Sequence, residues 1–535
     1  MKGFKFLLLV LTILILDSSF IFSQSRWVKV YHDEIDAVGD MIIESYDYGY
    51  LLLGRHGHNY SKLLWLIKTN INGEILWEKT IGDGMKTITF FDMHQDVLGN
   101  TFLGGGSFFY DSSGDPIVMK INSCGEQQWC KVFYTDNNMD YSSCMALTQE
   151  GEPVVVLNVT NPDHTKDRIC LSKLSADGEQ IWNQCYNSSD TSQRNEITSD
   201  IICTPDQGFL ITGLCYYEDP TVPNHWIPHP YLLKVDSTGL FEWETVIFKE
   251  ANLDGGHAWS SIINPNENFY YSSISHYSYH DSTVKSSPAI AKLDLDGNVI
   301  SVNNIVNGTK YGKLSYAQFL NDSTLAASAG WGNSDSDLWS RAVIIDTLGN
   351  LLISTVLMQD IYTSILQVTY DGKLVYASNT YQNDQFDFYL TKLNQNLEDD
   401  SLYTFPFTYD SLCPYQIDSD TIVQDDCELI VGVEEEEEIR RQGDKETRGE
   451  LDIWPNPASG IVDCRLPIVD LRGDWTLMIY DIFGRPAPIP GPSPTRGKGE
   501  VWWSLDVSNL PPGVYFISIL QDGWRVKGGK FVVSR

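Results

Sequence analysis

Short apolar runs separated by turn residues recur along most of the chain. In DMIIESYDYGYLLLGRHG (40–57) and LLWLIKTNINGEILWEKTIG (63–82), apolar positions alternate with polar ones or follow one another, and Gly, Asn and Asp stand between the runs. A period of two is typical of β-strands, and Gly, Asn and Asp are the residues of tight hairpin turns. The pattern therefore predicts antiparallel hairpins.

The second of these hairpins is one copy of a repeat, and a hairpin of the first kind precedes it each time. The copies span 63–82, 116–134, 168–186, 230–248, 288–306, 341–358 and 388–405. Their turn glycines are Gly73, Gly125, Gly178, Gly239, Gly297 and Gly349, and Leu397 stands at this position in the last copy. The copies recur at intervals of roughly 50 to 60 residues, so each unit is expected to hold four antiparallel strands.

Seven such units predict an all-β fold with a seven-bladed β-propeller over residues 25–407. A single four-stranded sheet cannot bury both of its faces, whereas a closed ring of sheets can. Six or eight blades remain alternatives. RWVKVYHD (26–33) resembles the fourth strand of a repeat and could complete the last blade, but SLYTFPF (401–407) could fill the same place.

Residues 1–24 have the features of a secretory signal peptide. Lys2 and Lys5 precede an apolar run, Leu7–Leu16, and the small residue Ser23 stands at a position suited to cleavage. The run is too short to cross a bilayer, and no other segment approaches the ~20 apolar residues of a spanning helix. The mature chain is therefore expected to be exported, with no transmembrane segment.

Charge excludes one class of partner. Asp and Glu number 71 against 37 Lys and Arg, which gives a formal net charge of -34. Such a surface repels phosphate backbones, so nucleic-acid binding is not expected. Aromatic residues make up 12% of the chain, which argues against disorder and suits β-structure.

The 10 cysteines all follow the signal segment, and an even number in an exported chain favours disulfides. Cys170 and Cys185 are symmetric about a repeat turn, so they should face each other across paired strands. Cys413 and Cys427 are expected to close a short loop in an extension, residues 408–433, worth roughly 3 kcal/mol. No CxxC pair is present, and we expect no zinc site, other metal or cofactor.

Residues 434–535 do not continue the propeller repeat. Residues 434–450 carry a glutamate run without apolar periodicity, which predicts a solvated acidic linker. Residues 451–535 contain short alternating runs between turn signals such as PNPASG and LPPGVY. This pattern predicts a small all-β domain at the C-terminus.

Four ordered motifs make this C-terminal stretch resemble the type A sorting domain of proteins exported by the type IX secretion system of Bacteroidetes. They are Pro455-Asn456-Pro457-Ala458-Ser459-Gly460, Tyr480-Asp481 with Gly484, Leu510 with Gly513-Val514-Tyr515, and Lys530-Phe531-Val532-Val533. The resemblance implies an immunoglobulin-like β-sandwich recognised by the outer-membrane secretion machinery. It also implies a passenger that passes through the periplasm and is then released or attached to the cell surface. The propeller repeats loosely resemble those of other secreted Bacteroidetes proteins.

Histidine and aromatic residues are predicted to gather on one face of the ring. Loops after the second and fourth strands of each blade emerge on the same face, and all histidines except His94 are placed there, including His32, His164 and His257. The candidate ligand-binding residues are His56, His58, His225, Trp226, His229, His276, Tyr277, His280, Trp331 and Trp339. Long polar loops also collect histidine because strands exclude it, so this gathering has a purely structural explanation as well.

Aromatic rings offer stacking surface, and His, Asn and Asp offer hydrogen bonds, as glycan or peptide recognition requires. The sequence therefore favours a non-catalytic binding or adhesion module for a glycan or a protein. The alternative is an extracellular hydrolase or lyase with a site on the same face. A scaffold without a small ligand is a third hypothesis. No catalytic motif stands in a supporting context, so no catalytic residue is nominated.

Overall fold

In this computed structural model the described residues are 27–31, 36–57, 63–82, 87–108, 115–133, 141–160, 167–186, 193–219, 222, 225–249, 253–264, 266, 268–279, 284–334, 339–358, 365–382, 385–422, 427–430, 452–454, 461–467, 475–481, 495–497, 500–521 and 524–534. The predicted signal peptide and acidic linker lie outside them. Within the described part, no helix has the length and apolar character needed to cross a membrane. The chain divides into two compact units, Met1–Glu435 and Glu436–Arg535.

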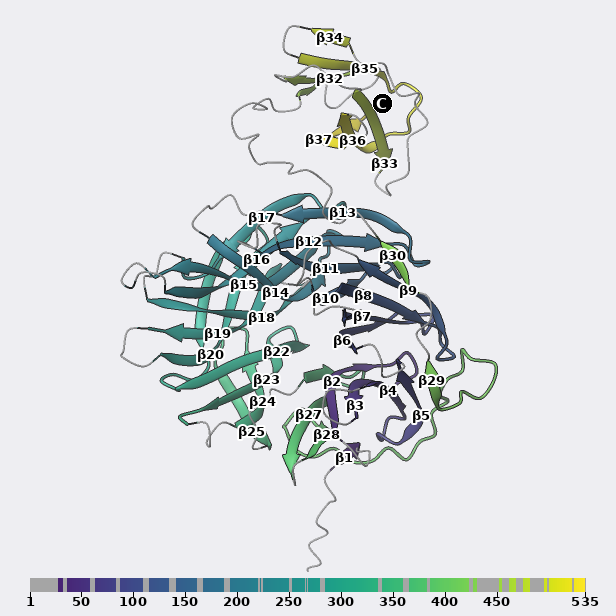
Figure 1. The fold of residues 1–535 in the computed structure, drawn as a ribbon. Helices are drawn as coiled ribbons and strands as arrows, with labels where there is room; N and C mark the ends of the chain where they lie inside the picture. Colours follow the sequence, from purple (N-terminus) through teal and green to yellow (C-terminus); the bar gives the residue numbers. More distant parts are fainter. Residues whose placement is uncertain are drawn as a thin grey trace, which may run out of the picture. The chain divides into compact units, whose positions relative to one another are not determined.

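The first unit is a ring of four-stranded antiparallel blades (Figure 1). Blades 1 to 3 hold β2 (Ala37–Glu44), β3 (Tyr50–His56), β4 (Leu63–Thr69) and β5 (Ile75–Ile81); β6 (Thr87–Gln95), β7 (Thr101–Phe108), β8 (Asp115–Ile121) and β9 (Gln127–Phe133); and β10 (Tyr141–Leu147), β11 (Pro153–Thr160), β12 (Asp167–Leu174) and β13 (Gln180–Tyr186). Blades 4 and 5 hold β14 (Gln193–Cys203), β15 (Phe209–Glu218), β16 (Trp226–Val235) and β17 (Phe241–Val246); and β18 (Asp254–Asn264), β19 (Phe269–Ser278), β20 (Lys285–Asp294) and β21 (Val299–Asn304). Blades 6 and 7 hold β22 (Tyr311–Asn321), β23 (Thr324–Gly332), β24 (Trp339–Asp346) and β25 (Leu351–Met358); and β26 (Ile365–Val368), β27 (Leu374–Gln382), β28 (Gln385–Leu393) and β1 (Val28–Tyr31).

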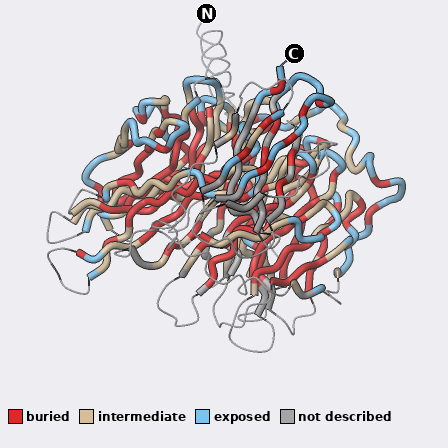
Figure 2. Tube along the Cα trace, turned by 90° about the horizontal axis from the view of Figure 1, so that it is seen from above, coloured by how far each residue is buried: buried red, intermediate tan, exposed pale blue. Residues whose placement is uncertain are grey.

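The ring has seven blades, as predicted. The first strand of every blade contacts the first strands of both neighbouring blades, including β26 of blade 7 against β2 of blade 1. Buried residues run along the strands, whereas exposed residues gather at turns and edges (Figure 2). Apolar clusters fill the spaces between adjacent blades, for example Leu51, Leu66, Met93 and Met119 between blades 1 and 2. Each blade thus buries faces that a single sheet would expose.

The N-terminal strand closes the ring. β1 pairs antiparallel with β28 in the register Val28↔Thr391 to Tyr31↔Phe388, so it is the outermost strand of blade 7. Trp27 is 2% exposed and packs edge-on against Tyr50 of blade 1. Residues 401–407 form no strand. Of the two candidates for this position, the N-terminal segment is therefore the one used.

Tryptophans of outer strands hold the turns of the following blade. Trp129 Nε1 donates to the Ala176 carbonyl at 3.1 Å, and Trp243 Nε1 donates to the Leu295 carbonyl at 3.0 Å. The glycines of these two turns lie against the same rings: a Cβ on Gly178 would sit 2.9 Å from Trp129, and one on Gly297 would sit 2.5 Å from Trp243. Gly297 also has φ +82°, where glycine alone is unstrained. These two glycines therefore serve both the turn and the joint between blades.

We expect Gly297→Ala to lower the free energy of unfolding by about 2 to 5 kcal/mol. The left-handed φ contributes about 1–2 kcal/mol and overpacking against Trp243 about 1–3 kcal/mol. Gly308→Ala is the matched control, because Gly308 has φ +77° and nothing lies within 4 Å of an added Cβ. Urea unfolding of both variants measures the difference. Equal losses would contradict the steric role of the tryptophan.

The described residues after blade 7, 408–422 and 427–430, form a segment that we call the strap. Its strands β29 (Asp420–Ile422) and β30 (Glu428–Ile430) pair parallel with β5 and β9, so they add a fifth strand to the outer edges of blades 1 and 2. Lys79 pairs with Asp420, and Lys131 pairs with Glu428. The strap therefore runs around the outside of two blades.

Two disulfides attach the strap to blade 2, and they correct the sequence prediction. Cys413 is bonded to Cys124 and Cys427 to Cys130, so the expected Cys413–Cys427 loop is not formed. The reason is that the strap crosses the outer strand of blade 2, which brings cysteines nearly 300 residues apart into contact. Cys170 is bonded to Cys185 across β12 and β13, where the two residues are direct cross-strand partners. Cys144, Cys203, Cys215 and Cys464 remain thiols.

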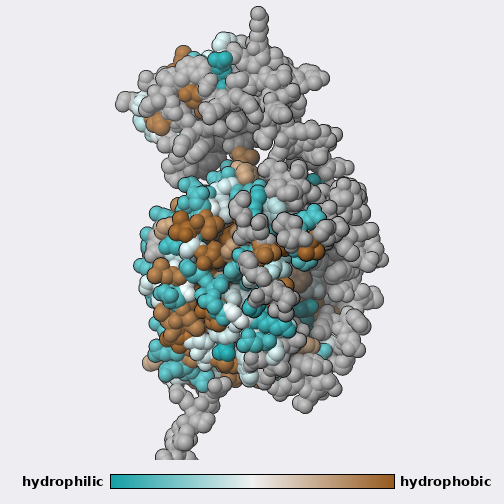
Figure 3. Space-filling view, turned by 90° about the vertical axis from the view of Figure 1, so that its left-hand side faces the viewer, coloured by the Kyte–Doolittle hydropathy of each residue, from teal (hydrophilic) through white to brown (hydrophobic). Residues whose placement is uncertain are grey.

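The outermost strands of blades 5 and 6 differ from those under the strap. Among the described residues, β21 and β25 have no added strand, and they expose Ile300, Leu351, Leu352 and Ile353. Figure 3 shows apolar patches among polar residues on this side of the propeller. Strand addition by the strap is thus confined to the two blades whose outer strands carry the pairing lysines.

The second unit is a small all-β domain with two sheets. β31 (Asp452–Trp454), β32 (Ile461–Pro467), β34 (Thr495–Gly497) and β35 (Glu500–Asp506) form one sheet; β33 (Trp475–Asp481), β36 (Gly513–Gln521) and β37 (Trp524–Val533) form the other. Val462, Trp503 and Ile517 are fully or almost fully buried in its core. Of the predicted sorting residues, Gly513 and Tyr515 lie in β36 and Lys530 in β37. The Tyr515 hydroxyl donates to the Pro511 carbonyl at 2.9 Å. Pro455, Asn456, Pro457, Gly460 and Gly484 lie outside the described residues.

Candidate functional site

The predicted ligand-binding residues do not form a single group. His58 and His280 lie outside the described residues. The sequence pattern places His229, His257 and His276 in loops, but they lie inside β16, β18 and β19, because β16 and β18 begin earlier and β19 ends later than the apolar pattern indicates. The other residues fall into three regions: between blades 4 and 5, on blade 6, and between blades 7 and 1.

The region between blades 4 and 5 holds most of them. His225 Nδ1 lies 3.0 Å from the Asp219 carboxylate, and the His225 ring meets Tyr279 edge-on. His276 lies between Asn304 and Asp254, at 2.9 and 3.2 Å from its two ring nitrogens, and stacks on Phe248. Burial raises the pKa of Tyr277. Their hydrogen bonds and ring contacts fix these side chains in place.

His229 and the blade 6 tryptophans serve packing. His229 is 5% exposed and contacts Tyr217 edge-on, and burial lowers the pKa of its imidazole. Trp331 and Trp339 are direct cross-strand partners in β23 and β24, and the Arg341 guanidinium lies 4.6 Å from the Trp331 ring centre. Trp226 pairs with Glu218 at the start of β16.

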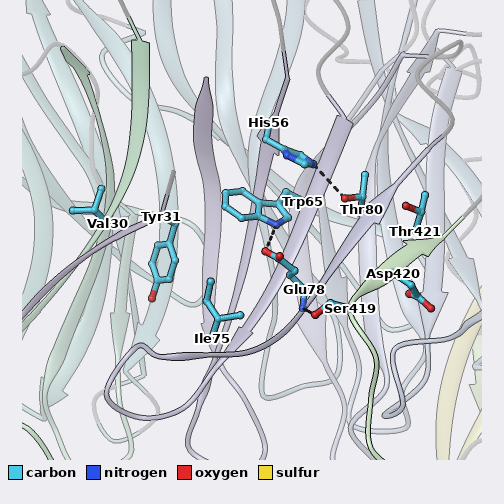
Figure 4. Close-up of a pocket in the computed structure, with 10 residues that line it drawn as sticks. All are labelled: Val30, Tyr31, His56, Trp65, Ile75, Glu78, Thr80, Ser419, Asp420 and Thr421. Carbon is cyan, nitrogen blue, oxygen red and sulfur yellow. Dashed lines mark hydrogen bonds between the residues drawn. The ribbon is translucent and has the colours of Figure 1, made fainter. Parts of the chain in front are cut away.

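His56, by contrast, lines a cavity between blades 7 and 1. The cavity has a volume of about 450 Å³, within the ~300–1,000 Å³ typical of small-ligand sites. Its walls come from β1, β3, β4, β5 and β29, through Val30, Tyr31, His56, Trp65, Ile75, Glu78, Thr80, Ser419, Asp420 and Thr421. Figure 4 shows His56, Trp65 and Glu78 between the β1 residues on one side and the strap residues on the other. The strap is thus one wall of the cavity.

Hydrogen bonds and stacking hold the centre of the cavity in one arrangement. The His56 and Trp65 rings stack with centres 5.1 Å apart, and Trp65 Nε1 donates to the Glu78 carboxylate at 3.0 Å. The Thr80 hydroxyl lies 3.3 Å from His56 Nε2. The Glu78 N–H donates to Ser419 Oγ at 3.1 Å, which ties the strap to the same strand. Side chains held in this way lose little further freedom when a ligand binds.

Strand geometry explains why these residues meet. Glu78 and Thr80 are two residues apart in β5 and so point to the same face, and Trp65 in β4 is the cross-strand partner of Thr80. Thr421 of the strap pairs with Thr80 in parallel register, and Tyr31 reaches from blade 7 to donate to the Gly73 carbonyl at 2.8 Å. The cavity therefore depends on both the closing strand and the strap.

The lining suits a hydroxylated ligand. The Glu78 and Asp420 carboxylates are acceptors, the serine and threonine hydroxyls donate or accept, and the imidazole and indole supply flat apolar surface. In the part of the chain that the structure describes, no cluster of His, Cys, Asp or Glu could hold a metal ion.

Sequence reasoning found one residue of this cavity, His56, and missed the others. Trp65, Glu78 and Thr80 lie inside strands of the repeat, and the sequence pattern nominates none of them. The alternation along β5 was a usable signal, because it places Glu78 and Thr80 on one face. Ser419, Asp420 and Thr421 had no such signal, because parallel pairing with a strand more than 300 residues away leaves no local pattern.

Comparison with known proteins identifies the C-terminal domain. Residues 452–534 match the family described as the secretion system C-terminal sorting domain. No curated protein matches the chain in sequence.

Solved structures resemble the chain only distantly. One is a protein of unknown function from Dyadobacter fermentans, 10% identical, with 58% of this chain and 96% of that chain covered and a TM-score of 0.42. Another is the polysaccharide lyase Uly1, 10% identical, with 70% and 94% covered and a TM-score of 0.42. A third is an alpha-L-arabinanase from Penicillium chrysogenum complexed with arabinobiose, 12% identical, with 57% and 92% covered and a TM-score of 0.37. At these values the likeness carries no information on function.

Proposed function

We propose that the propeller of this exported protein binds saccharides in the cavity between blades 7 and 1. Its export follows from residues 452–534, which are a type IX secretion sorting domain. The protein acts as a binding module, either released or held at the cell surface. The observation that supports this function is the cavity itself, where a fixed carboxylate, hydroxyls and stacked rings line the same space.

The negative charge of the protein indicates which saccharides the cavity can bind. The chain carries a net charge of -34, and the Glu78 carboxylate lines the cavity, together with Asp420, whose charge is offset by its ion pair with Lys79. A polyanionic glycan would be repelled both by the surface and by the site. Neutral sugars or amino sugars are therefore the expected ligands, because their hydroxyl and ammonium groups donate to carboxylates.

The test is binding of the mature protein to a panel of neutral and amino-sugar oligosaccharides, followed by calorimetric titration of those that bind. Glu78→Gln should weaken binding by about tenfold or more, because a hydrogen bond to a charged group contributes roughly 1.5–3 kcal/mol. The glutamine keeps an acceptor for Trp65, so the fold should be retained.

Glu244→Gln is the matched control. Glu244 occupies the equivalent position in blade 4, where its carboxylate accepts a hydrogen bond from the Tyr231 hydroxyl at 3.0 Å. This variant should bind as the parent protein does. Equal losses in both variants, or no binding to any saccharide on the panel, would refute the proposal. Turnover of a bound saccharide would instead favour the hydrolase or lyase alternative.

A further inference from the structure

The innermost strands carry β-bulges that place single residues at the ring axis. The register of β14 against β15 shifts between Thr198 and Asp200, which makes Ser199 the extra residue, and the register of β18 against β19 shifts at Trp259 in the same way. Bulges re-aim side chains, and they are over-represented next to active sites. Ser199 is half-buried.

Ser199 is hydrogen-bonded to a histidine of the next blade. Its Oγ lies 2.6 Å from His257 Nε2, within the range of a nucleophile and its general base. Burial, with a smaller contribution from the Lys313 charge, lowers the pKa of His257 to about 3. The imidazole is therefore neutral at pH 7, so Nε2 can accept a hydrogen bond from the serine hydroxyl when the ring proton is on Nδ1. The lowered pKa also makes His257 a weak base, because burial and the Lys313 charge both oppose its protonation.

Two further side chains complete the cluster. The His257 ring stacks on Trp259 with centres 3.6 Å apart, which fixes the plane of the imidazole. Trp259 is itself held by a 2.9 Å hydrogen bond from Nε1 to Ser275. Lys313 Nζ lies 3.4 Å from the centre of the Trp259 ring and supplies a positive charge near the imidazole. Asp200 is engaged elsewhere, because it accepts the Ser261 N–H at 2.9 Å.

We propose that Ser199 and His257 form a nucleophile–base pair at the ring axis that cleaves carboxylic esters, with Lys313 stabilising the negative charge that develops on the ester oxygen. This site is distinct from the saccharide cavity: it lies on the innermost strands of blades 4 to 6, whereas the cavity lies between the outer strands of blades 7 and 1. Activated esters are favoured over alkyl esters and amides, because a weakly basic imidazole removes the serine proton only poorly and a good leaving group departs without being protonated.

The reaction is a double displacement. Ser199 Oγ bonds to the acyl carbon while its proton passes to His257 Nε2; the ester C–O bond breaks, the leaving group departs as an anion, and it then takes that proton. Water then attacks the acyl-serine and gives a proton to His257. The acid is released as the serine oxygen recovers the proton, so the enzyme is regenerated without any further reactant.

The test is labelling of the mature protein with a fluorophosphonate probe, which loses fluoride as the serine oxygen bonds to phosphorus, followed by peptide mass spectrometry. Label is expected on Ser199, and Ser199→Ala should abolish it. His257→Gln should slow labelling and p-nitrophenyl acetate hydrolysis by about 100-fold or more, the usual contribution of a general base. Lys313→Met should slow hydrolysis while leaving saccharide binding unchanged.

Ser260→Ala is the matched control, because Ser260 is also on β18 but donates to the Ser315 carbonyl at 2.8 Å and not to an imidazole. It should label at the parent rate. Absence of label from the folded parent, or label that persists on Ser199→Ala, would overturn the proposal. Neither result would affect the saccharide proposal, whose variants lie in the cavity.

Discussion

A chain that lacks residues 451–535 is expected to fold and to stay in the periplasm. The sorting domain is the part that the secretion machinery recognises, so its removal leaves an exported propeller with no route across the outer membrane. Cell fractionation and protease accessibility of intact cells should show a complete loss of surface-exposed or released protein. Unimpaired delivery of the shortened chain would refute the sorting role.

The structure explains why this deletion should not unfold the propeller. The C-terminal core is built only from residues of the second unit, and the cores between the blades use only residues before the linker. The periplasmic fragment should therefore melt with the cooperativity of the parent propeller. As the reciprocal control, residues 451–535 fused to an inert periplasmic protein should carry it to the cell surface.

The ring could be predicted from the sequence because its information is local and repeated. The alternation of apolar positions, the turn glycines and the spacing of the copies each depend on residues close together in the chain, and seven copies reinforce the same pattern. The closing strand was also visible, because residues 26–33 carry the repeat signature. Its competition with residues 401–407 could be decided only by the pairing of β1 with β28.

The strap could not be predicted because its contacts are long-range. Short-range reasoning favoured Cys413 with Cys427, since a small loop costs little entropy to close. That argument ignores where the chain runs after blade 7. Parallel pairing of β29 and β30 with outer strands carries Cys413 and Cys427 past blade 2, so each meets a cysteine of that blade.

The candidate sites likewise depend partly on local sequence and partly on contacts between residues that are far apart in the chain. His56 was predicted because it ends a strand at a loop, whereas Glu78 was hidden inside a repeat. The pair of Ser199 and His257 depends on a bulge and on the packing of two blades, and neither has a signature in the flanking residues. The sequence pattern located the blades. The contact between blades that brings Ser199 to His257 is visible only in the structure.

Removal of both strap disulfides should destabilise the protein by more than the two single removals add up to. When one bridge is present, the other closes a loop of only about 20 residues, worth roughly 3 kcal/mol by chain entropy. When neither is present, a loop of nearly 300 residues is also released, for a total of roughly 9 kcal/mol. Urea unfolding of Cys413→Ser, Cys427→Ser and the double variant measures these losses. Strictly additive losses would contradict this account.

The double variant should also lose saccharide binding, because the strap supplies Ser419, Asp420 and Thr421 to the cavity wall. The control is Cys170→Ser with Cys185→Ser, which opens a bridge with a sequence separation of 15 in blade 3. That variant should lose about 3 kcal/mol of stability and keep the parent affinity. The double strap variant is tested under conditions where the protein remains folded. If it still binds saccharide there, the strap stabilises the ring but does not shape the binding site. If only the strap variant loses binding, the effect is specific to the cavity wall, because a general loss of stability would weaken both.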